Sequence, residues 1–399
     1  MKKLAIAALL FSVLSSSVPV RALPAYEPIP EDLKILSKEG MDSIYAVDIP
    51  AAEKYFNEAL QKYPDHPIPH FGIAMAKWAQ LEYLEDESDP KLEQQYGELT
   101  DEAIKVGNAW IKKHPGDATA YLVLGGMYGL RARLAVLQHR WITAYFTGRK
   151  ALAATRKSLE LDPEMYDAYL GLGMYEYYAG TLSGVVKILA HFLMRGDANK
   201  GLEMLNICRE KGYFNALAAK LLLIEIYTTT GSPYENTALA VKWSRELRKD
   251  FPDHPQMHFV EIVSLFENKQ YDECRKDCLE YFNDVEDGKP NYRRRYLPRI
   301  LTAIGTTYLA QKDYDKAVEY FQKAVDTLKT DPANPARWGV WAIVRLGNVA
   351  DLRGDRATAV KYYREAMSYK DEWGFSETVR HYLKRPFTAA MLPGQMPPP

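Results

Sequence analysis

Small and apolar residues recur at helical spacing toward the C-terminal end of the chain. One unit joins two such runs: Leu301, Ile304, Gly305 and Tyr308, followed by Tyr314, Ala317, Phe321 and Ala324. Residues three or four positions apart share a face of a helix, so the unit predicts two helices that pack as a hairpin. Similar residues return at 343–366. A recurring hairpin cannot bury its apolar face alone, so the units are expected to stack into a solenoid with a concave surface.

Weaker copies of this pattern extend upstream to about residue 52. Helix-like runs in four units end at a proline in the same place: Pro64, Pro115, Pro163 and Pro252. Proline inside a helix costs about 3 kcal/mol, so these residues mark hairpin boundaries. No alternating strand pattern is present. The sequence therefore predicts an all-α, right-handed superhelical solenoid of about eight antiparallel helix hairpins.

The second, third and fourth hairpins carry extra apolar sequence that favours helix, as in 130–145 and 185–193. Shared between both arms, it would lengthen each helix by about 7–8 residues, or about 11 Å. Residues 86–90 are polar, contain a proline and predict a surface loop. We expect five segments: a signal peptide at 1–22, N-terminal helices with a first hairpin at 23–66, an elongated lobe at 67–213, a regular array with a capping helix at 214–387, and a disordered tail at 388–399.

The first residues have the pattern of a secretory signal peptide. Lys2 and Lys3 precede an apolar stretch at 4–14, and small residues come before a cut after Ala22. The stretch is well short of the roughly 20 residues that a spanning helix needs, so cleavage near Ala22 is expected rather than an anchor. No later stretch is long and apolar enough to cross a membrane. Because the Lys-Lys start is typical of bacteria, we expect a periplasmic or secreted protein.

Charge and cysteine content exclude two classes of function. The formal net charge is −1, which offers no general basic face for nucleic acid. The three cysteines, Cys208, Cys274 and Cys278, occupy core positions of the pattern. Residues four apart on a helix hold their Cβ atoms about 5–6 Å apart, whereas a disulfide needs about 3.5–4.5 Å. Buried free thiols are therefore expected in place of a Cys274–Cys278 redox pair.

The repeated motif resembles the tetratricopeptide repeat, in which Trp/Leu-x-x-Leu-Gly-x-x-Tyr precedes Ala-x-x-x-Phe-x-x-Ala. The resemblance covers nearly all of the chain after residue 22. A narrower likeness, in 180–189 and 196–205, is to exported bacterial repeat proteins and the tetratricopeptide-repeat protein 39 group. The broad family implies binding of peptides or protein segments in a groove formed by first helices, without catalysis. Its carboxylate clamp uses Lys, Arg and Asn, and only Asn348 matches, so this clamp is not expected.

Two other features have a chemical and a structural interpretation. The pairs His66/His70 and His254/His258 lie in parallel Pro-Asp-His-Pro segments. Zinc needs three or four ligands and no third is placed, so repeat junctions are favoured over metal sites. The run Arg293–Arg295 is either a docking patch for an acidic or phosphorylated partner, or a solvated helix start balanced by nearby acids. The common catalytic motifs are missing, and no cofactor is expected.

Candidate partner-binding residues are the first-helix positions expected to face the groove, together with the basic run. They are Tyr121, Leu170, Met174, Tyr177, Tyr178, Arg293, Arg294, Arg295, Thr302, Thr306, Trp341, Asn348 and Asp351. In the elongated lobe these residues either form an exposed partner site or are core beneath the lengthened helices, and core is favoured. The sequence predicts an exported, non-catalytic adaptor for a protein or peptide. The alternative is a carrier of an apolar small molecule or lipid, for which an enclosed apolar cavity in the N-terminal lobe is expected.

Overall fold

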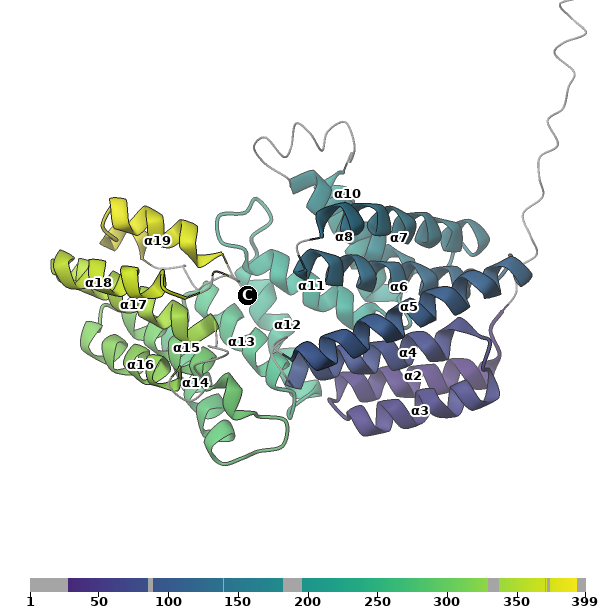
Figure 1. Cartoon of the computed structure of the whole chain (residues 1–399), viewed down its shortest axis with the longest axis horizontal. Coiled ribbons are helices and arrows are strands. Elements are labelled where there is room, and N and C mark those ends of the chain that lie inside the picture. The colour runs from purple at the N-terminus through teal and green to yellow at the C-terminus, as the bar shows by residue number, and fades with distance from the viewer. Residues whose placement is uncertain are drawn as a thin grey trace, which may run out of the picture.

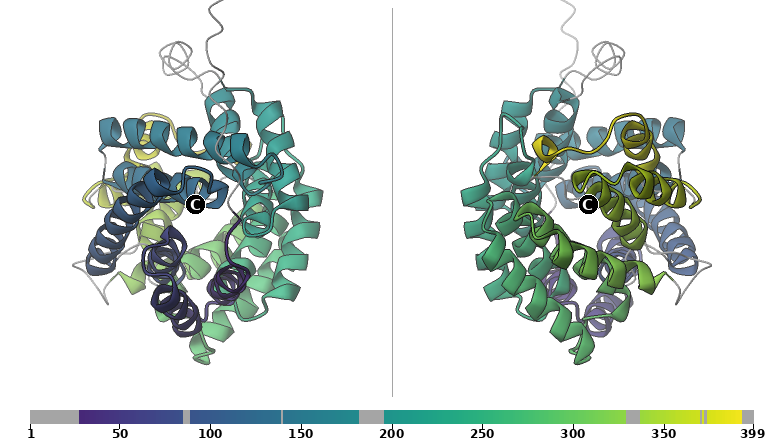
Figure 2. Two further views of the ribbon diagram at one scale, coloured as in Figure 1. Left: turned by 90° about the vertical axis from the view of Figure 1, so that its right-hand side faces the viewer. Right: turned by 90° about the vertical axis from the view of Figure 1, so that its left-hand side faces the viewer.

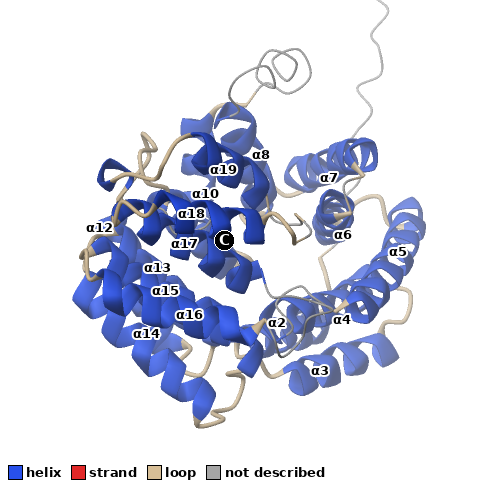
Figure 3. Ribbon diagram, turned by 60° about the vertical axis from the view of Figure 1, so that its left-hand side comes forward, coloured by secondary structure: helices blue, strands red, loops and turns tan. Residues whose placement is uncertain are grey.

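The structure, a computed structural model, describes residues 28–84, 89–138, 140–181, 196–328, 337–369, 371 and 374–392. Within these ranges the regular elements are helices and no strand is present (Figures 1 and 3). Consecutive helices pair as antiparallel hairpins: α2 (Glu31–Tyr45) with α3 (Ile49–Lys62), α4 (Pro67–Ala79) with α5 (Pro90–Lys113), α6 (Ala118–Leu137) with α7 (Trp141–Leu161), α8 (Ala168–Thr181) with α10 (Ala198–Lys211), α11 (Ala216–Thr228) with α12 (Thr237–Asp250), α13 (Pro255–Glu267) with α14 (Tyr271–Glu286), α15 (Leu297–Ala310) with α16 (Tyr314–Thr327), and α17 (Arg337–Leu352) with α18 (Arg356–Ala366). Three short elements, η1 (Gln80–Leu84), η2 (Arg294–Tyr296) and η3 (Ala389–Met391), and a last helix, α19 (Phe375–Lys384), complete the described chain. The prediction of an all-α solenoid is confirmed.

Polar residues at the hairpin junctions set where the helices begin. Asp117 caps α6 by accepting a hydrogen bond from the backbone N–H of Ala120 at 2.8 Å. The ring nitrogens Nδ1 of His66 and His254 serve α4 and α13 in the same way, 3.2 Å from Ile68 N and 3.1 Å from Gln256 N. An N-cap acceptor satisfies one of the backbone donors that a helix start leaves without a partner. The matched histidine segments are thus equivalent junctions of the repeat.

Glycines of the first helices receive the aromatic rings of the second helices. A Cβ atom at Gly305 would lie 2.6 Å from the Phe321 ring, and one at Gly347 would lie 2.4 Å from the Tyr363 ring. Phe321 and Tyr363 are fully buried. The Gly and Phe positions of the sequence pattern are therefore two sides of one contact, in which the missing side chain makes room for the ring.

The lengthened helices are present where the structure describes them. α5 has 24 residues, α6 has 20 and α7 has 21, against 14 in α10, α12 and α15. In the fourth unit, α8 and α10 have 14 residues each, and the extra sequence at 182–195 lies outside the described residues. The expected signal peptide at 1–22 and most of the expected loop at 86–90 also lie outside them.

The glycine-rich segment of the fourth unit packs backbone against backbone. A Cβ atom at Gly201 on α10 would lie 2.5 Å from Tyr177 N and 2.8 Å from Gly173 O on α8. At Gly180 it would lie 2.5 Å from Ala198 N. Only hydrogen fits at such distances, so these glycines allow the two helices to approach closely. The glycines of this segment therefore have a packing role.

The solenoid curves until its N-terminal hairpins meet units far along the chain, and the end-on views show the helices surrounding a central space (Figure 2). The Tyr296 hydroxyl in η2 donates a hydrogen bond to the backbone carbonyl of Tyr83 in η1. The Tyr83 ring lies 4.8 Å from the ring of His254, edge to face. Lys34 Nζ of α2 lies 4.8 Å from the Tyr213 ring centre. These contacts close one turn of the superhelix, which the sequence pattern did not predict.

The chain after α19 folds back onto the C-terminal hairpins. The Phe387 N–H donates to Asp351 Oδ2 at 2.8 Å, and Phe387 is buried. Leu392 packs against the apolar clusters of both C-terminal units. The expected disordered tail at 388–399 therefore needs correction, because residues 388–392 include η3 and are held by these apolar contacts. Residues 393–399 lie outside the described chain.

Candidate binding cavity

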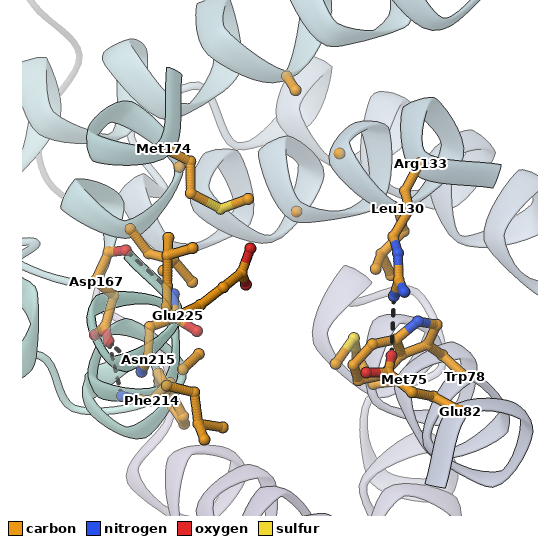
Figure 4. A pocket seen from close by; sticks show the side chains of 18 of the residues that line it. Met75, Trp78, Glu82, Leu130, Arg133, Asp167, Met174, Phe214, Asn215 and Glu225 are labelled. Carbon is orange, nitrogen blue, oxygen red and sulfur yellow. Dashed lines mark hydrogen bonds and ion pairs between the residues drawn. The ribbon is translucent and has the colours of Figure 1, made fainter. Parts of the chain in front are cut away.

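The central space holds a cavity of about 2030 Å³. Its wall is formed mainly by first helices, namely α2, α4, α6, α8, α11 and α13, with parts of α7. The closure between η1 and η2 brings these helices around the same space. Figure 4 shows two sides of the wall facing each other, with Arg133 and Trp78 on one side and Met174 and Glu225 on the other.

The side formed by α4, η1 and α6 combines an aromatic surface with a paired cation. Arg133 Nη1 lies 2.9 Å from Glu82 Oε2, and its guanidinium lies 5.2 Å from the Trp78 ring centre (Figure 4). Met75 and Leu130 extend the apolar part of this wall. The arginine is held in place by an ion pair and a cation–π contact. It therefore presents a fixed positive charge to the cavity.

The opposite side is fixed by Asp167, which lies just before α8. Its carboxylate accepts hydrogen bonds from three consecutive backbone N–H groups, those of Tyr213 at 3.1 Å, Phe214 at 2.8 Å and Asn215 at 2.7 Å. Bonds from backbone N–H to a carboxylate are stronger than neutral ones. Asp167 thus holds the turn before α11 against the start of α8. Two neighbouring pieces of the cavity wall are fixed to each other by this contact.

Two carboxyl groups line the cavity on α11 and α13. Burial raises the pKa of Glu225, while the Tyr178 hydroxyl donates to its carboxylate at 3.3 Å and the charge of Arg133 also opposes the rise. Burial likewise raises the pKa of Glu267, which accepts a hydrogen bond from the Thr230 hydroxyl. A carboxylate that has lost water gains most from a cationic partner. This wall therefore favours basic groups.

The structure places the candidates of the elongated lobe in different settings. Leu170 and Met174 line the cavity, and Met174 is 39 % exposed. Tyr178 is exposed beside Glu225, whereas Tyr177 is buried in the core between α8 and α11. Tyr121 is half-buried on α6. Tyr177 is therefore core, Leu170 packs against that core at the cavity wall, and Met174 is exposed in the cavity.

The candidates of the C-terminal hairpins do not line an open groove, which corrects our expectation. Thr302 and Thr306 are buried and donate to backbone carbonyls one turn back, each at 2.7 Å. Trp341 is buried, and the buried Asn348 amide donates to the Tyr363 hydroxyl at 3.0 Å. Asp351 accepts from Arg356 at 2.9 Å in addition to Phe387. Neighbouring helices and the returning chain end cover these positions.

The basic run before α15 is exposed at Arg293 and Arg294 and half-buried at Arg295. Arg294 Nη1 lies 3.3 Å from Glu286. Local acids thus balance part of this charge, as the structural interpretation expects. The cavity is lined by other residues.

The cysteines lie in the core, and two further histidine nitrogens have hydrogen-bonding partners in the protein. Cys208, Cys274 and Cys278 are buried free thiols. His70 Nε2 lies 2.8 Å from the Pro64 carbonyl, and His258 Nδ1 lies 3.0 Å from the Tyr292 hydroxyl. Within the described ranges, no group of three or more His, Cys, Asp or Glu side chains is placed to hold a metal ion.

None of the helices in the described part of the chain is long and apolar enough to span a membrane.

A smaller hollow of about 450 Å³ lies between α12, α13 and α14. Two of its lining residues are carboxylic acids whose pKa values are raised. Burial, and then the neighbouring charge of Asp277, raises the pKa of Glu261 to about 7. Burial also raises the pKa of Asp277 to about 6. Ionisation of these two groups near neutral pH therefore lowers the free energy of unfolding.

The sequence model of the tetratricopeptide-repeat family matches residues 296–372. This segment is therefore similar to a tetratricopeptide-repeat array. It includes α15 to α18, in which the paired glycine and aromatic positions are clearest. The search of curated proteins returns no match to the chain.

Several solved structures are similar to most of the chain at low identity. One is a tetratricopeptide repeat protein from Parabacteroides merdae, 16 % identical, covering 74 % of this chain and 93 % of that one with a TM-score of 0.32. Another is the human IFIT1 dimer with m7Gppp-AAAA, 12 % identical, covering 90 % and 86 % with a TM-score of 0.48. A third is NprR in complex with its cognate peptide NprX, 17 % identical, covering 89 % and 93 % with a TM-score of 0.39.

Proposed function

We propose that this protein is a non-catalytic adaptor that binds an extended segment of another protein, or a peptide, in the central cavity. The size of the cavity carries the proposal. At about 2030 Å³ it exceeds the range of about 300–1,000 Å³ that suits one small molecule. Its wall comes from successive first helices, so an extended chain can contact one hairpin after another.

The chemistry of the lining supports a peptide over a lipid. Trp78, Leu170 and Met174 offer apolar surface to side chains, while Arg133 and Glu225 offer fixed charges of opposite sign. A peptide can match both kinds of surface. An alkyl chain would displace water from both charged groups without offering either of them a hydrogen bond, which is costly. The alternative function of apolar carrier is therefore disfavoured.

Peptide selection tests the proposal. Peptides would be selected from a random displayed library on the folded protein, and their affinities measured by calorimetry. We expect Met174→Arg or Glu225→Lys to weaken binding about tenfold or more, as central interface residues do. Ile35→Arg is the matched control, because Ile35 is 51 % exposed on α2 and outside the cavity. Equal affinities in all variants would contradict the proposal, as would tight fatty-acid binding that Met174→Arg abolishes.

We further propose that the adaptor acts after export to the periplasm or the cell exterior. This part depends on the sequence of residues 1–22, which lie outside the described structure. The test is cell fractionation with N-terminal sequencing of the mature chain. A mature start near residue 23 in the envelope or medium is the expected result, and an uncleaved cytoplasmic chain is the contrary one.

A further inference from the structure

The tip of the α6–α7 hairpin exposes large apolar side chains. Ile142 is 77 % exposed, and Trp141 and Phe146 are each 61 % exposed. Val136, in the last turn of α6, is exposed beside them. Ile142 and Phe146 lie one helical turn apart, so they share a face of α7. We call these four residues the α7 tip. Most other apolar residues of comparable size in the described chain are buried or half-buried.

The hairpin that carries the α7 tip has an unusual charge. From Ala118 to Leu159 the sequence contains seven Arg and Lys residues and no Asp or Glu, although the whole chain has a net charge of −1. Seven of the 51 Lys and Arg residues thus lie in one stretch without an acid, which Asp117 and Glu160 flank. Such a segment is a strong positive patch for any anionic surface.

Among the described residues, carboxylates pair with both cations on α6 and with Lys157 near the end of α7, whose Nζ lies 2.9 Å from Glu160 Oε2. Arg131 Nε lies 2.8 Å from Asp101 of α5, and Arg133 pairs with Glu82. Glu93, the acid near the end of α6, accepts a hydrogen bond from Gln138 at 2.9 Å. Among the described residues, Arg140 and Lys150 have no carboxylate partner, and both are exposed.

Charge and apolar surface therefore occupy the same face. Lys150 lies one turn beyond Phe146, and Arg140 precedes Trp141 at the start of α7. α7 lies on the outer edge of the N-terminal lobe, away from α13–α19 (Figure 1). Exposed Trp, Phe and Ile among basic residues match the headgroup region of an anionic bilayer, where aromatic rings insert and cations contact lipid phosphates.

We propose that the α7 tip, with Arg140 and Lys150, docks this protein on the surface of an anionic lipid membrane. A second copy of the chain is a poorer occupant, because two such hairpins would bring like charges together. A nucleic acid would use the cations and the rings, but it would leave Ile142 and Val136 exposed to water. The docking is peripheral and independent of the guest in the central cavity.

Vesicle sedimentation of the full chain tests this inference, with phosphatidylcholine vesicles that contain or lack phosphatidylglycerol. Binding is expected only with the anionic lipid, and it should weaken as salt rises. Arg140→Gln with Lys150→Gln should weaken it about 30-fold, which is about 2 kcal/mol for two surface cations. Ile142→Ser with Phe146→Ser should weaken it at least about tenfold, because both insertions are lost. Ile35→Ser is the exposed control and should bind as the wild type does.

Three results would overturn the proposal. The first is binding that does not depend on anionic lipid, or that survives both double variants. The second is a wild-type dimer in sedimentation that Ile142→Ser with Phe146→Ser converts to monomer, without vesicle binding by either. The third is tight binding of a single-stranded oligonucleotide by the same patch, without vesicle binding. All variants change exposed residues, and circular dichroism would confirm that each is folded.

Discussion

Tyr296→Phe tests the contact that closes the superhelical turn. The Tyr296 side chain is fully buried, and its hydroxyl donates to the Tyr83 carbonyl in η1. That carbonyl belongs to the end of a helical segment, where the last carbonyls have no partner within the helix. The Phe variant keeps the ring, so its packing against Arg299, whose guanidinium lies 4.6 Å from the ring centre, is retained.

The variant removes the Tyr296 hydroxyl and leaves the Tyr83 carbonyl without this donor. A buried polar group that loses its partner costs about 1–2 kcal/mol. The free energy needed to open η1 away from η2 should fall by the same amount. This corresponds to an open population that is about 5- to 30-fold larger. Solenoids can open locally, so a local measurement is more informative than a global melting curve.

Hydrogen exchange followed by mass spectrometry gives that local measurement. Peptides that contain residues 80–84 should exchange about 5- to 30-fold faster in Tyr296→Phe, with little change in peptides from α16. Tyr320→Phe is the matched control, because its ring stacks on Tyr308 at 5.6 Å on a regular hairpin far from η1. Unchanged exchange at 80–84, or an equal effect from Tyr320→Phe, would refute the closed turn.

Three further substitutions test individual contacts. Gly201→Ala should destabilise the protein by about 1–3 kcal/mol in urea unfolding, because a Cβ there meets the α8 backbone; Gly148→Ala, where a Cβ would meet open space, should stabilise it by about 0.5–1 kcal/mol. Asp167→Ala should cost about 1–3 kcal/mol, because three backbone donors lose their acceptor. The raised pKa of Glu261, about 7, means that stability falls as pH rises from about 4.5 to 7. Glu261→Gln should reduce this loss of stability by about 1–3 kcal/mol, as measured from melting curves at pH values between 4.5 and 7. Glu203→Gln, on the exposed face of α10, is the control and should leave the loss unchanged.

The local parts of the fold could be predicted because they depend on residues close in the sequence. Gly305 with Phe321, and Gly347 with Tyr363, are recurring contacts within one hairpin. Prolines mark the end of the second helix in four of the units. The buried thiol of Cys274 follows from the same register. Each of these features follows from helical periodicity and the volume of one side chain.

The cavity could not be predicted in the same way, because it depends on how the hairpins accumulate curvature. Small rotations between successive units bring Tyr83 to Tyr296, and no single motif encodes their sum. Thr302 and Asn348 are buried by contacts with their own and the adjacent hairpin, which the repeat pattern did not indicate. Glu225 was missed because the unit of α11 was recognised by its second helix only, so its first-helix face had no register.

The position of the bound guest is the most direct test of the account. A photoreactive benzoylphenylalanine placed at Met174 should cross-link a selected peptide, and the same residue at Ile35 should not. Mass spectrometry of the cross-linked product would then locate the peptide beside α8. A cross-link from Ile35 or from the outer face of α16, with none from Met174, would show that partners bind elsewhere and would contradict the central cavity as the binding site.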